Sequence, residues 1–532
     1  MKNRDVKLLH LFAEFMNRFK TNSFPNDMQN YSFGTLKYSI WLGIMAVIVL
    51  VISSYSAGAQ NTDTTFVTKA VGPQHVLKLT EAIQVALANN SQVKRSLLNL
   101  KDADEQVKLA WSEVLPDVTG SATYTRNLEI PVNFVPAKFF NPNAAPDELI
   151  PLQFGTDNNW HGGFSVQQTL FSGEAFVGIS TSKLYKAAQS ENLRATTQQI
   201  VTQTRLAYYN VLVAQEQLRL QQATVDRLCK NLEENKAREN AGLVDHYAVL
   251  QVQVQLSNQE PQLTQAKHAV NQANRELKVV MGVPLDLEFD VQGDLSSFEV
   301  SAQSATKGVN ENLKKVDGMT PYQYHADTNI MDIATDKRGD IRMVEKQNQL
   351  KTKQIKAIKG RFLPQLMADY NLNWSAAQAG NPVFFGTSDT RARSQTLGLT
   401  LSWPIFQGFQ RTANLNIAKI EKKDLEEQKR AAVRSAKNEV LSARESLNQA
   451  IETAPARKKA LDLAREGYNR AQARLENGIG SQLDVTNAEL QLRQAETNYA
   501  EMVYHYLSAK AHYDKAIGMV PFVDQNEPIL ND

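Results

Sequence analysis

Four short segments of the chain alternate apolar and polar residues, at 118–125, 164–170, 366–374 and 397–403. A period of two places one set of side chains on each face of a β-strand. In the third segment the apolar set is Leu366, Ala368, Tyr370, Leu372 and Trp374, against Asp369, Asn371 and Asn373. Strands of about 9–11 residues with one apolar and one hydroxyl- or amide-bearing face suit a wall between lipid and a wet lumen. Each strand alone would also suit a soluble sheet, but four strands attached to very long helices favour the membrane wall.

The pattern predicts strands at about 117–126, 163–171, 365–375 and 395–404, with surface loops at 129–158 and 376–392. Long helices are predicted at about 175–281 and 408–516, where the sequence is rich in Ala, Gln, Glu, Lys and Leu. A helix of roughly 65–70 residues spans on the order of 100 Å. In the second stretch Val433, Ala436, Val440, Ala443, Leu447 and Ala450 follow coiled-coil spacing. Pro261 and Pro455 fall inside these helices, and we expect bends there.

The chain contains two copies of one unit. Leu115-Pro116 and Leu363-Pro364 open corresponding strands, and Leu170-Phe171-Ser172-Gly173 and Ile405-Phe406-Gln407-Gly408 close corresponding strands. The offset between the copies is 235 or 236 residues, for example between Gly242 and Gly478. We therefore predict a first repeat at 60–284, a connecting segment at 285–335, and a second repeat with a C-terminal tail at 336–532.

The first 59 residues resemble an N-terminal extension with a secretory signal peptide. Lys37 precedes thirteen apolar residues from Ile40 to Ile52, and Ala57-Gly58-Ala59 forms an A-x-A cleavage site. The apolar run is shorter than the roughly twenty residues of a transmembrane helix, although an uncleaved anchor is an alternative. The true start is Met1 or Met28, and the mature chain is predicted to begin near Gln60.

Charge and cysteine content exclude some functions. Without residues 1–59 the chain keeps 58 − 6 = 52 Lys and Arg against 56 − 3 = 53 Asp and Glu, so its net charge is close to zero. It therefore lacks the excess of positive charge with which proteins attract nucleic acid. Cys229 is the single cysteine, which excludes an intramolecular disulfide.

Four strands cannot close a barrel, because about eight are the practical minimum. Unpaired strand edges are not tolerated in lipid, so several chains must share one barrel. Two chains would give roughly eight strands and a plugged interior, whereas three would give roughly twelve strands and a lumen. The sequence favours a trimer over a dimer.

The duplicated unit, the Leu-Pro strand openings, the strand exits and the turns at Gly242-Leu243 and Gly478-Ile479 resemble the TolC family of outer-membrane efflux proteins. The resemblance covers roughly residues 75–520. It implies a mainly α fold with a small β part, in which a homotrimer forms a twelve-stranded transmembrane β-barrel in outer-membrane lipid, continued by a periplasmic α-helical coiled-coil barrel. It also implies two partners, a periplasmic adaptor (membrane fusion) protein and an inner-membrane pump such as an RND-type or ABC transporter.

The resemblance also suggests where function is located. It places the turns Gly242, Leu243, Gly478 and Ile479 at the periplasmic tip, where adaptors dock. Family members can carry two acidic residues three positions apart that form rings at the pore constriction; here these positions are Asp484 and Asn487. Three crowded Asp484 carboxylates should raise their pKa and attract cations, whereas the alternative is a solvated acid at a helix N-terminus. An ionic link that closes the tip of one member maps to Ala248 and Gly480, so closure here must use other contacts.

We predict that aromatic side chains at Tyr124, Trp160, Trp374 and Trp403 mark the membrane interfaces. No catalytic motif, nucleotide-binding loop or cofactor motif is present in the sequence, and the seven-residue spacing of His505 and His512 is not typical of a metal site. The resemblance therefore implies a passive export duct, and the sequence predicts no catalytic, cofactor or metal site. The alternatives are a structural or adhesive coiled-coil surface protein and a specific porin for uptake.

Overall fold

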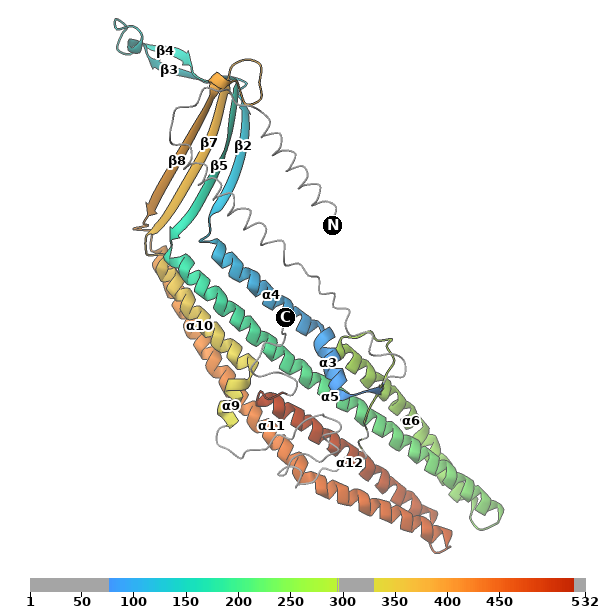
Figure 1. Cartoon of the computed structure of the whole chain (residues 1–532). Coiled ribbons are helices and arrows are strands. Elements are labelled where there is room, and N and C mark those ends of the chain that lie inside the picture. Colours follow the sequence, from blue (N-terminus) through green and yellow to red (C-terminus); the bar gives the residue numbers. More distant parts are fainter. Residues whose placement is uncertain (1–75, 294, 296–329, 521–532) are drawn as a thin grey trace, which may run out of the picture. The chain divides into compact units, whose positions relative to one another are not determined.

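The computed structural model describes residues 76–293, 295 and 330–520 (Figure 1). The predicted signal peptide, both candidate start codons and most of the connecting segment lie outside these residues.

The central sheet contains β2 (Asp117–Arg126), β5 (Asn158–Phe171), β7 (Gln365–Gln378) and β8 (Arg391–Ser402). Its order is β2-β5-β7-β8 and each neighbouring pair is antiparallel. The edge strands β2 and β8 therefore come from different repeats. Because the strands alternate in direction, all four connections to helices lie at one end of the sheet, and the two strand-to-strand connections lie at the other end, here called the loop end (Figure 1).

Three strands differ in length from the expectation. β5 begins five residues before the expected 163, β7 ends three residues after the expected 375, and β8 begins four residues before the expected 395, while Trp403 lies just beyond the end of β8. Asn158, Asn159 and Gly162 do not alternate in polarity, yet all pair in register with both neighbouring strands. Pairing with neighbours decides strand length here, which a single-strand pattern does not show.

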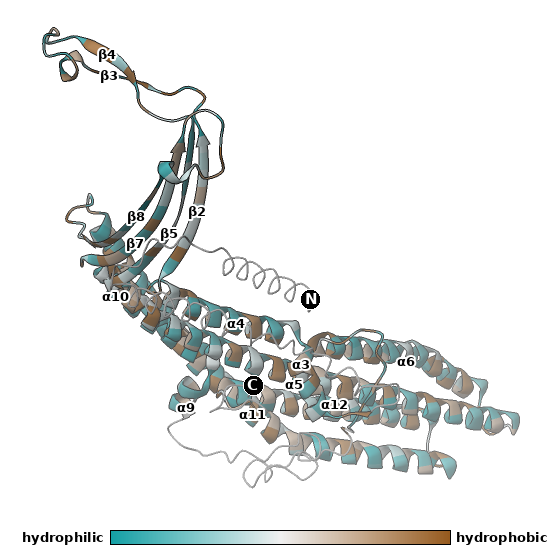
Figure 2. Ribbon diagram, turned by 45° about the horizontal axis from the view of Figure 1, so that its top comes forward, coloured by the Kyte–Doolittle hydropathy of each residue, from teal (hydrophilic) through white to brown (hydrophobic). Residues whose placement is uncertain are grey.

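The register places the four alternating patterns on common faces. Val118 pairs with Val166, Val166 with Tyr370, and Tyr370 with Leu397. Directly paired residues share a face, so one face of the sheet is apolar and the other carries residues such as Thr119, Ser165, Asn371 and Thr396. We call these the apolar face and the polar face; in Figure 2 hydrophobic and hydrophilic residues follow one another along these strands.

The alternation of β5 is interrupted near its end. A β-bulge between Thr169 and Phe171 leaves Leu170 outside the register and pairs Phe171 with Leu366. A bulge adds one residue to one strand, so the alternation changes phase at that point.

The expected surface loop at 129–158 contains regular structure. β3 (Val132–Pro136) and β4 (Leu149–Gln153) form an antiparallel hairpin, and a 3₁₀ turn (η1, Ala137–Phe139) follows β3. Pro136 and Pro151 obscured this hairpin in the sequence, but proline is accepted on a strand that has no neighbour on its N–H side. The loop between β7 and β8 contains a second 3₁₀ turn (η3, Ser388–Thr390).

The helices α4 (Ser91–Ser112), α5 (Gly173–Asn240), α10 (Gly339–Gly360) and α11 (Gln410–Glu476) connect to the strands. α5 contacts both α4 and α10, and α10 contacts α11. The start of α5 and the end of α10 touch through glycines, because a Cβ on Gly173 would lie 2.9 Å from the carbonyl oxygen of Gly360. This close approach fixes the two repeats side by side directly next to the sheet.

Each repeat ends in a pair of antiparallel helices. α5 pairs with α6 (His246–Met281), and α11 pairs with α12 (Gln482–Ala516). Five of the six residues expected in the seam of the second pair are buried, namely Ala436, Val440, Ala443, Leu447 and Ala450, whereas Val433 is half-buried. Pro261 and Pro455 lie inside continuous helices.

A compact core lies where the repeats meet. α3 (Leu79–Asn89) packs on α5 and α6, and β1 (Val76–Leu77) pairs in parallel with β6 (Asp290–Val291). The Tyr208 hydroxyl donates to the carbonyl oxygen of Leu77 at 3.0 Å. In the second repeat α9 (Ile330–Lys337) precedes α10 and contacts α11.

The two repeats are also joined through a buried ion pair. The Arg205 guanidinium on α5 is fully buried, and its Nη1 lies 2.8 Å from an Asp514 carboxylate oxygen on α12. A charge with no access to water depends on such a partner.

Candidate functional site at the helix turns and on the sheet

The two helix pairs end in turns of the same geometry. Leu243 N donates to the Arg238 carbonyl and Gly242 N to the Glu239 carbonyl, at 2.9 and 2.8 Å. This is a Schellman motif, which places a left-handed residue directly after the helix. Gly242 occupies that position with φ 72°, and no atom lies within 4 Å of where its Cβ would be.

The second turn repeats the first. Ile479 N donates to the Arg474 carbonyl and Gly478 N to the Leu475 carbonyl, again with φ 72° at the glycine. The apolar residue after each glycine usually packs back on its helix, but Leu243 is 74% exposed and Ile479 is 70% exposed. The turns therefore present one exposed aliphatic side chain each to whatever lies beyond them.

Asp484 lies in the first turn of α12, where it forms a capping box with Ser481. Ser481 N donates to the Asp484 carboxylate at 3.1 Å, and Asp484 N donates to the Ser481 hydroxyl oxygen at 3.2 Å. The hydrogen bonds from Ser481 hold the pKa of Asp484 below its ordinary value. In the single chain Asp484 is thus a solvated helix-terminal acid; the ring of three carboxylates stays a prediction about the assembly.

Asn487 follows Asp484 by three residues on the same helix, and both side chains are exposed. Residues three apart share a helix face. The structure therefore brings the two candidate constriction residues together on one exposed face of α12.

The family resemblance predicts that Asp484→Asn lowers the cation selectivity of the expected pore, measured as the reversal potential across a KCl gradient in planar bilayers. The substitution keeps an oxygen that can accept the Ser481 N–H but removes the charge. Because Asp484 is charged only above its pKa, selectivity should be present at neutral pH and decline as the pH falls through that pKa.

Asp245→Asn is the matched control for this prediction, since Asp245 is an exposed acid at the N-terminus of α6. It should leave selectivity nearly unchanged. An Asp484→Asn channel with wild-type reversal potential and conductance would exclude Asp484 from the constriction.

Polar contacts join the α5–α6 pair to the α11–α12 pair close to the turns. Arg238 Nη1 donates to the Leu475 carbonyl at 3.2 Å, and Asn235 Nδ2 donates to Gln482 Oε1 at 3.0 Å. Ala248 and Gly480 cannot form an ionic link, and Gly480 lies against Arg474, whose Cβ would be 3.0 Å from an added Cβ. Within one chain, these contacts hold the pairs together.

A charged cluster lies on the same helices, farther from the Gly242 and Gly478 turns. Arg227 of α5 lies 3.3 Å from Glu489 and 3.6 Å from Glu496, both on α12, and its guanidinium lies 5.9 Å from the Tyr468 ring centre. Burial raises the pKa of Glu496, and the nearby Arg227 opposes that rise. Sequence reasoning missed this cluster, because its members are 262 and 269 positions apart and no local spacing connects them.

The predicted interface aromatics lie at opposite ends of the apolar face. Tyr124 and Trp160 pair across β2 and β5 with ring centres 4.8 Å apart, and Trp374 contacts Phe164 at 6.3 Å. Trp403 lies at the helix end, where its Nε1 donates to the Phe362 carbonyl at 3.3 Å. Trp160 is only 7% exposed, so within one chain Tyr124 offers more surface to the surroundings than Trp160 does.

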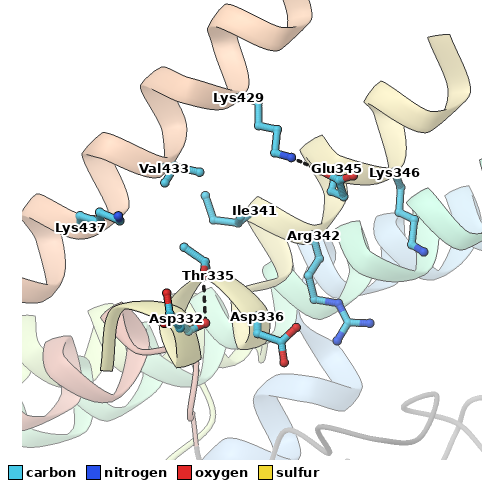
Figure 3. Close-up of a pocket in the computed structure, with 10 residues that line it drawn as sticks. All are labelled: Asp332, Thr335, Asp336, Ile341, Arg342, Glu345, Lys346, Lys429, Val433 and Lys437. Carbon is cyan, nitrogen blue, oxygen red and sulfur yellow. Dashed lines mark hydrogen bonds and ion pairs between the residues drawn. The ribbon is translucent and has the colours of Figure 1, made fainter. Parts of the chain in front are cut away.

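A groove of about 530 Å³ lies between α9, α10 and α11 (Figure 3). Two of its cations form ion pairs. Lys429 contacts Glu345 and holds the pKa of that carboxyl below its ordinary value, and Arg342 pairs with Glu191 at 2.7 Å. Such a groove, which carries charges of both signs, does not point to a particular ligand.

His505 and His512 line another groove, between α11 and α12. Burial lowers the pKa of His512. Among the described residues no group of three or more His, Cys, Asp or Glu is arranged to hold a metal ion. No helix in the described ranges is both long and apolar enough to span a membrane.

Comparison with known proteins identifies relatives that match both repeats of the chain. The chain matches a family model described as outer membrane efflux protein over residues 82–283 and 330–519. It is 22% identical over 442 residues to outer membrane protein TolC of Escherichia coli (strain K12), covering 83% of this chain and 82% of that protein. It is 24% identical over 367 residues to the alkaline protease secretion protein AprF of Pseudomonas aeruginosa, covering 68% and 70%.

Solved structures show the same fold. The open state of the Neisseria gonorrhoeae MtrE outer membrane channel superposes with a TM-score of 0.65 at 18% identity, covering 85% of this chain and 91% of that one. The Campylobacter jejuni CmeC outer membrane channel superposes with a TM-score of 0.64 at 18% identity, covering 84% and 87%.

Proposed function

Because the chain belongs to the outer membrane efflux protein family, we propose that it is a passive exit duct of a tripartite efflux or secretion system. Three copies form a barrel in the outer membrane, and their long helices continue into the periplasm. The cargo is small molecules such as drugs, toxic compounds or metals. A periplasmic adaptor and an inner-membrane pump, of the RND or ABC type, supply the connection and the energy.

The four-stranded sheet is the observation that carries this proposal. Leu397, Leu399 and Leu401 on its apolar face are 79%, 69% and 68% exposed in the single chain. Within the described residues, β2 and β8 each pair with one strand only. A face this apolar and two open edges are unfavourable in water, and open edges are unfavourable in lipid. A ring in which β8 of one copy pairs with β2 of the next removes both problems.

The number of copies follows from barrel size. With four strands per chain, two copies give roughly eight strands, whose interior is filled by side chains, and three copies give roughly twelve. The polar face, with Thr119, Ser165, Asn371 and Thr396, would then line a lumen wide enough for water and cargo.

The full chain, expressed in a double-membraned host that lacks its own efflux duct, tests the proposal. We expect it in the outer-membrane fraction, with a detergent-corrected mass of three chains by light scattering and discrete single-channel conductances in planar bilayers. A water-soluble monomer or elongated dimer would overturn the proposal and favour the adhesive coiled-coil alternative. Loss of resistance to exported compounds on gene deletion would identify the cargo class.

We expect Leu243→Asp and Ile479→Asp together to weaken export without disturbing assembly. Both side chains are exposed at the turns, so the change costs little folding free energy but places charge where an adaptor hairpin would pack. The measurement is drug susceptibility of the host alongside the trimer yield.

Leu463→Asp is the control, because Leu463 is 58% exposed on α11 away from the turns. It should leave both readouts unchanged. Normal export by the double turn variant would remove Leu243 and Ile479 from the docking surface.

A further inference from the structure

Three arginines interrupt the apolar face at its loop end. Arg126 ends β2, and Arg391 and Arg393 begin β8. Arg126 pairs with Asn158, Arg393 with Trp374, and Arg391 with Ala376. Alternation from Tyr124, two residues before Arg126, and pairing with Trp374 place all three on the apolar face.

Among the residues that the structure describes, none forms an ion pair with these three arginines. In the part of the chain that the structure describes, no carboxylate lies within 4.0 Å of Arg126, Arg391 or Arg393, although many other arginines form such pairs. Arg391 donates to the carbonyl oxygens of Phe385 and Gly386 at 2.8 and 3.0 Å, which ties the β7–β8 loop down. The Arg393 guanidinium lies over the Trp374 ring at 5.9 Å and is exposed.

The distance along β8 between Arg393 and Trp403 matches the thickness of the apolar band of a membrane barrel. From Arg393 to Trp403 the chain advances ten residues, which is about 34 Å along a strand at about 3.4 Å per residue. A tilt of about 40° reduces this to about 26 Å, close to the apolar band of about 25 Å in such barrels. Leu397, Leu399 and Leu401 lie between these limits and are exposed.

The arginines lie on β2 and β8. These are the two outer strands of the sheet (Figure 1), which a closed ring would join. β2 and β8 run in opposite directions, so β8 of one copy can pair antiparallel with β2 of the next. The end of β2 then meets the start of β8. Each seam between copies thereby combines Arg126 of one chain with Arg391 and Arg393 of its neighbour, on the lipid-facing side.

We propose that each seam at the loop end is a binding site for the phosphate group of an outer-leaflet lipid, shared between two chains. Arginine forms bidentate, charge-assisted hydrogen bonds with phosphate, and cationic side chains beside aromatic ones suit the headgroup level. The lipid acyl chains would lie along the exposed leucines of β8. This inference rests on the proposed barrel and adds a ligand to it.

Native mass spectrometry of the detergent-solubilised assembled protein tests the site. The probes are phosphatidylglycerol, for a phospholipid source, and lipid A, for a phosphorylated glycolipid source. Phosphatidylcholine is the comparison lipid, because its own choline neutralises its phosphate. We expect the wild type to retain one or both probes in preference to phosphatidylcholine, and the probe that is retained identifies the source.

Arg126→Gln with Arg393→Gln should weaken that retention roughly tenfold or more, since each cation near a headgroup contributes on the order of 1 kcal/mol. Arg391 is left intact because it holds the loop. The matched control is Arg434→Gln with Arg444→Gln, which removes two exposed α11 charges and should retain lipid normally. Arg126→Lys with Arg393→Lys keeps the charge and should retain most of the binding.

Equal retention of both probes by the Gln double variant and the wild type would overturn the site, as would a wild type without preference over phosphatidylcholine. Should the double variant not assemble, Arg393→Gln alone and the Lys variant provide the same comparison. A wild type that forms trimers without lipid preference refutes the lipid site alone, whereas a wild type that forms no trimers refutes the proposed duct as well.

Discussion

Leu399→Arg should prevent the protein from accumulating as a trimer in the outer membrane. Leu399 is 69% exposed on the apolar face of β8, close to midway between Arg393 and Trp403. An arginine facing lipid at the midplane of a barrel costs about 2–4 kcal/mol. The cost recurs in every copy, so the three copies of the proposed trimer would lose an amount comparable to the whole stability of an ordinary domain. The measurements are outer-membrane fractionation and the yield of heat-resistant oligomer on unheated gels.

The neighbouring residue supplies a matched control. Thr400 is also exposed on β8 but lies on the polar face, paired with Met367. Thr400→Arg introduces the same side chain one residue away, where a wet lumen would solvate it, and should leave assembly near wild type. Equal assembly of both variants would show that the two faces have similar surroundings and would contradict the barrel.

The alternation of residues such as Leu366, Ala368 and Tyr370 was sufficient to predict four strands and their faces, because the period of a strand is local. Strand ends were harder. Asn158 and Asn159 extend β5 only because partners on both sides complete the ladder, and the bulge before Phe171 depends on β7. Local propensity carries no information about such partners.

The helix turns were likewise predictable only in part. Gly242 and Gly478 were predictable, since a helix that reverses direction favours glycine at the left-handed position. The contacts that hold the helix pairs together were not. Arg227 meets Glu489 and Glu496 only after two repeats have packed on each other, and a charged residue on a long helix looks in sequence like any solvated one. Similarly, the sequence identified Asp484 as an acid at a helix terminus. It did not show that Ser481 N donates to the Asp484 carboxylate in a capping box.

Asp514→Ala should destabilise the helical region by about 3–5 kcal/mol, the usual cost of removing one partner of a buried ion pair. The reason is Arg205, which has no exposed surface and lies 2.8 Å from the Asp514 carboxylate. Without that carboxylate, the guanidinium keeps its charge in a site from which water is excluded. The expected result is a thermal midpoint several degrees lower, followed by far-UV circular dichroism of the detergent-solubilised protein.

Two further variants separate the buried charge from the loss of contact. Asp462→Ala removes an acid that lies 3.9 Å from Lys458 on the exposed surface of α11, and it should cost less than about 1 kcal/mol. Arg205→Met combined with Asp514→Leu replaces the pair by apolar side chains and should recover most of the stability. If the double variant is as unstable as Asp514→Ala, then the pair stabilises the protein by its own attraction rather than by neutralising a buried charge. Because α5 belongs to the first repeat and α12 to the second, that outcome would mean that the attraction within this ion pair stabilises the contact between the two repeats.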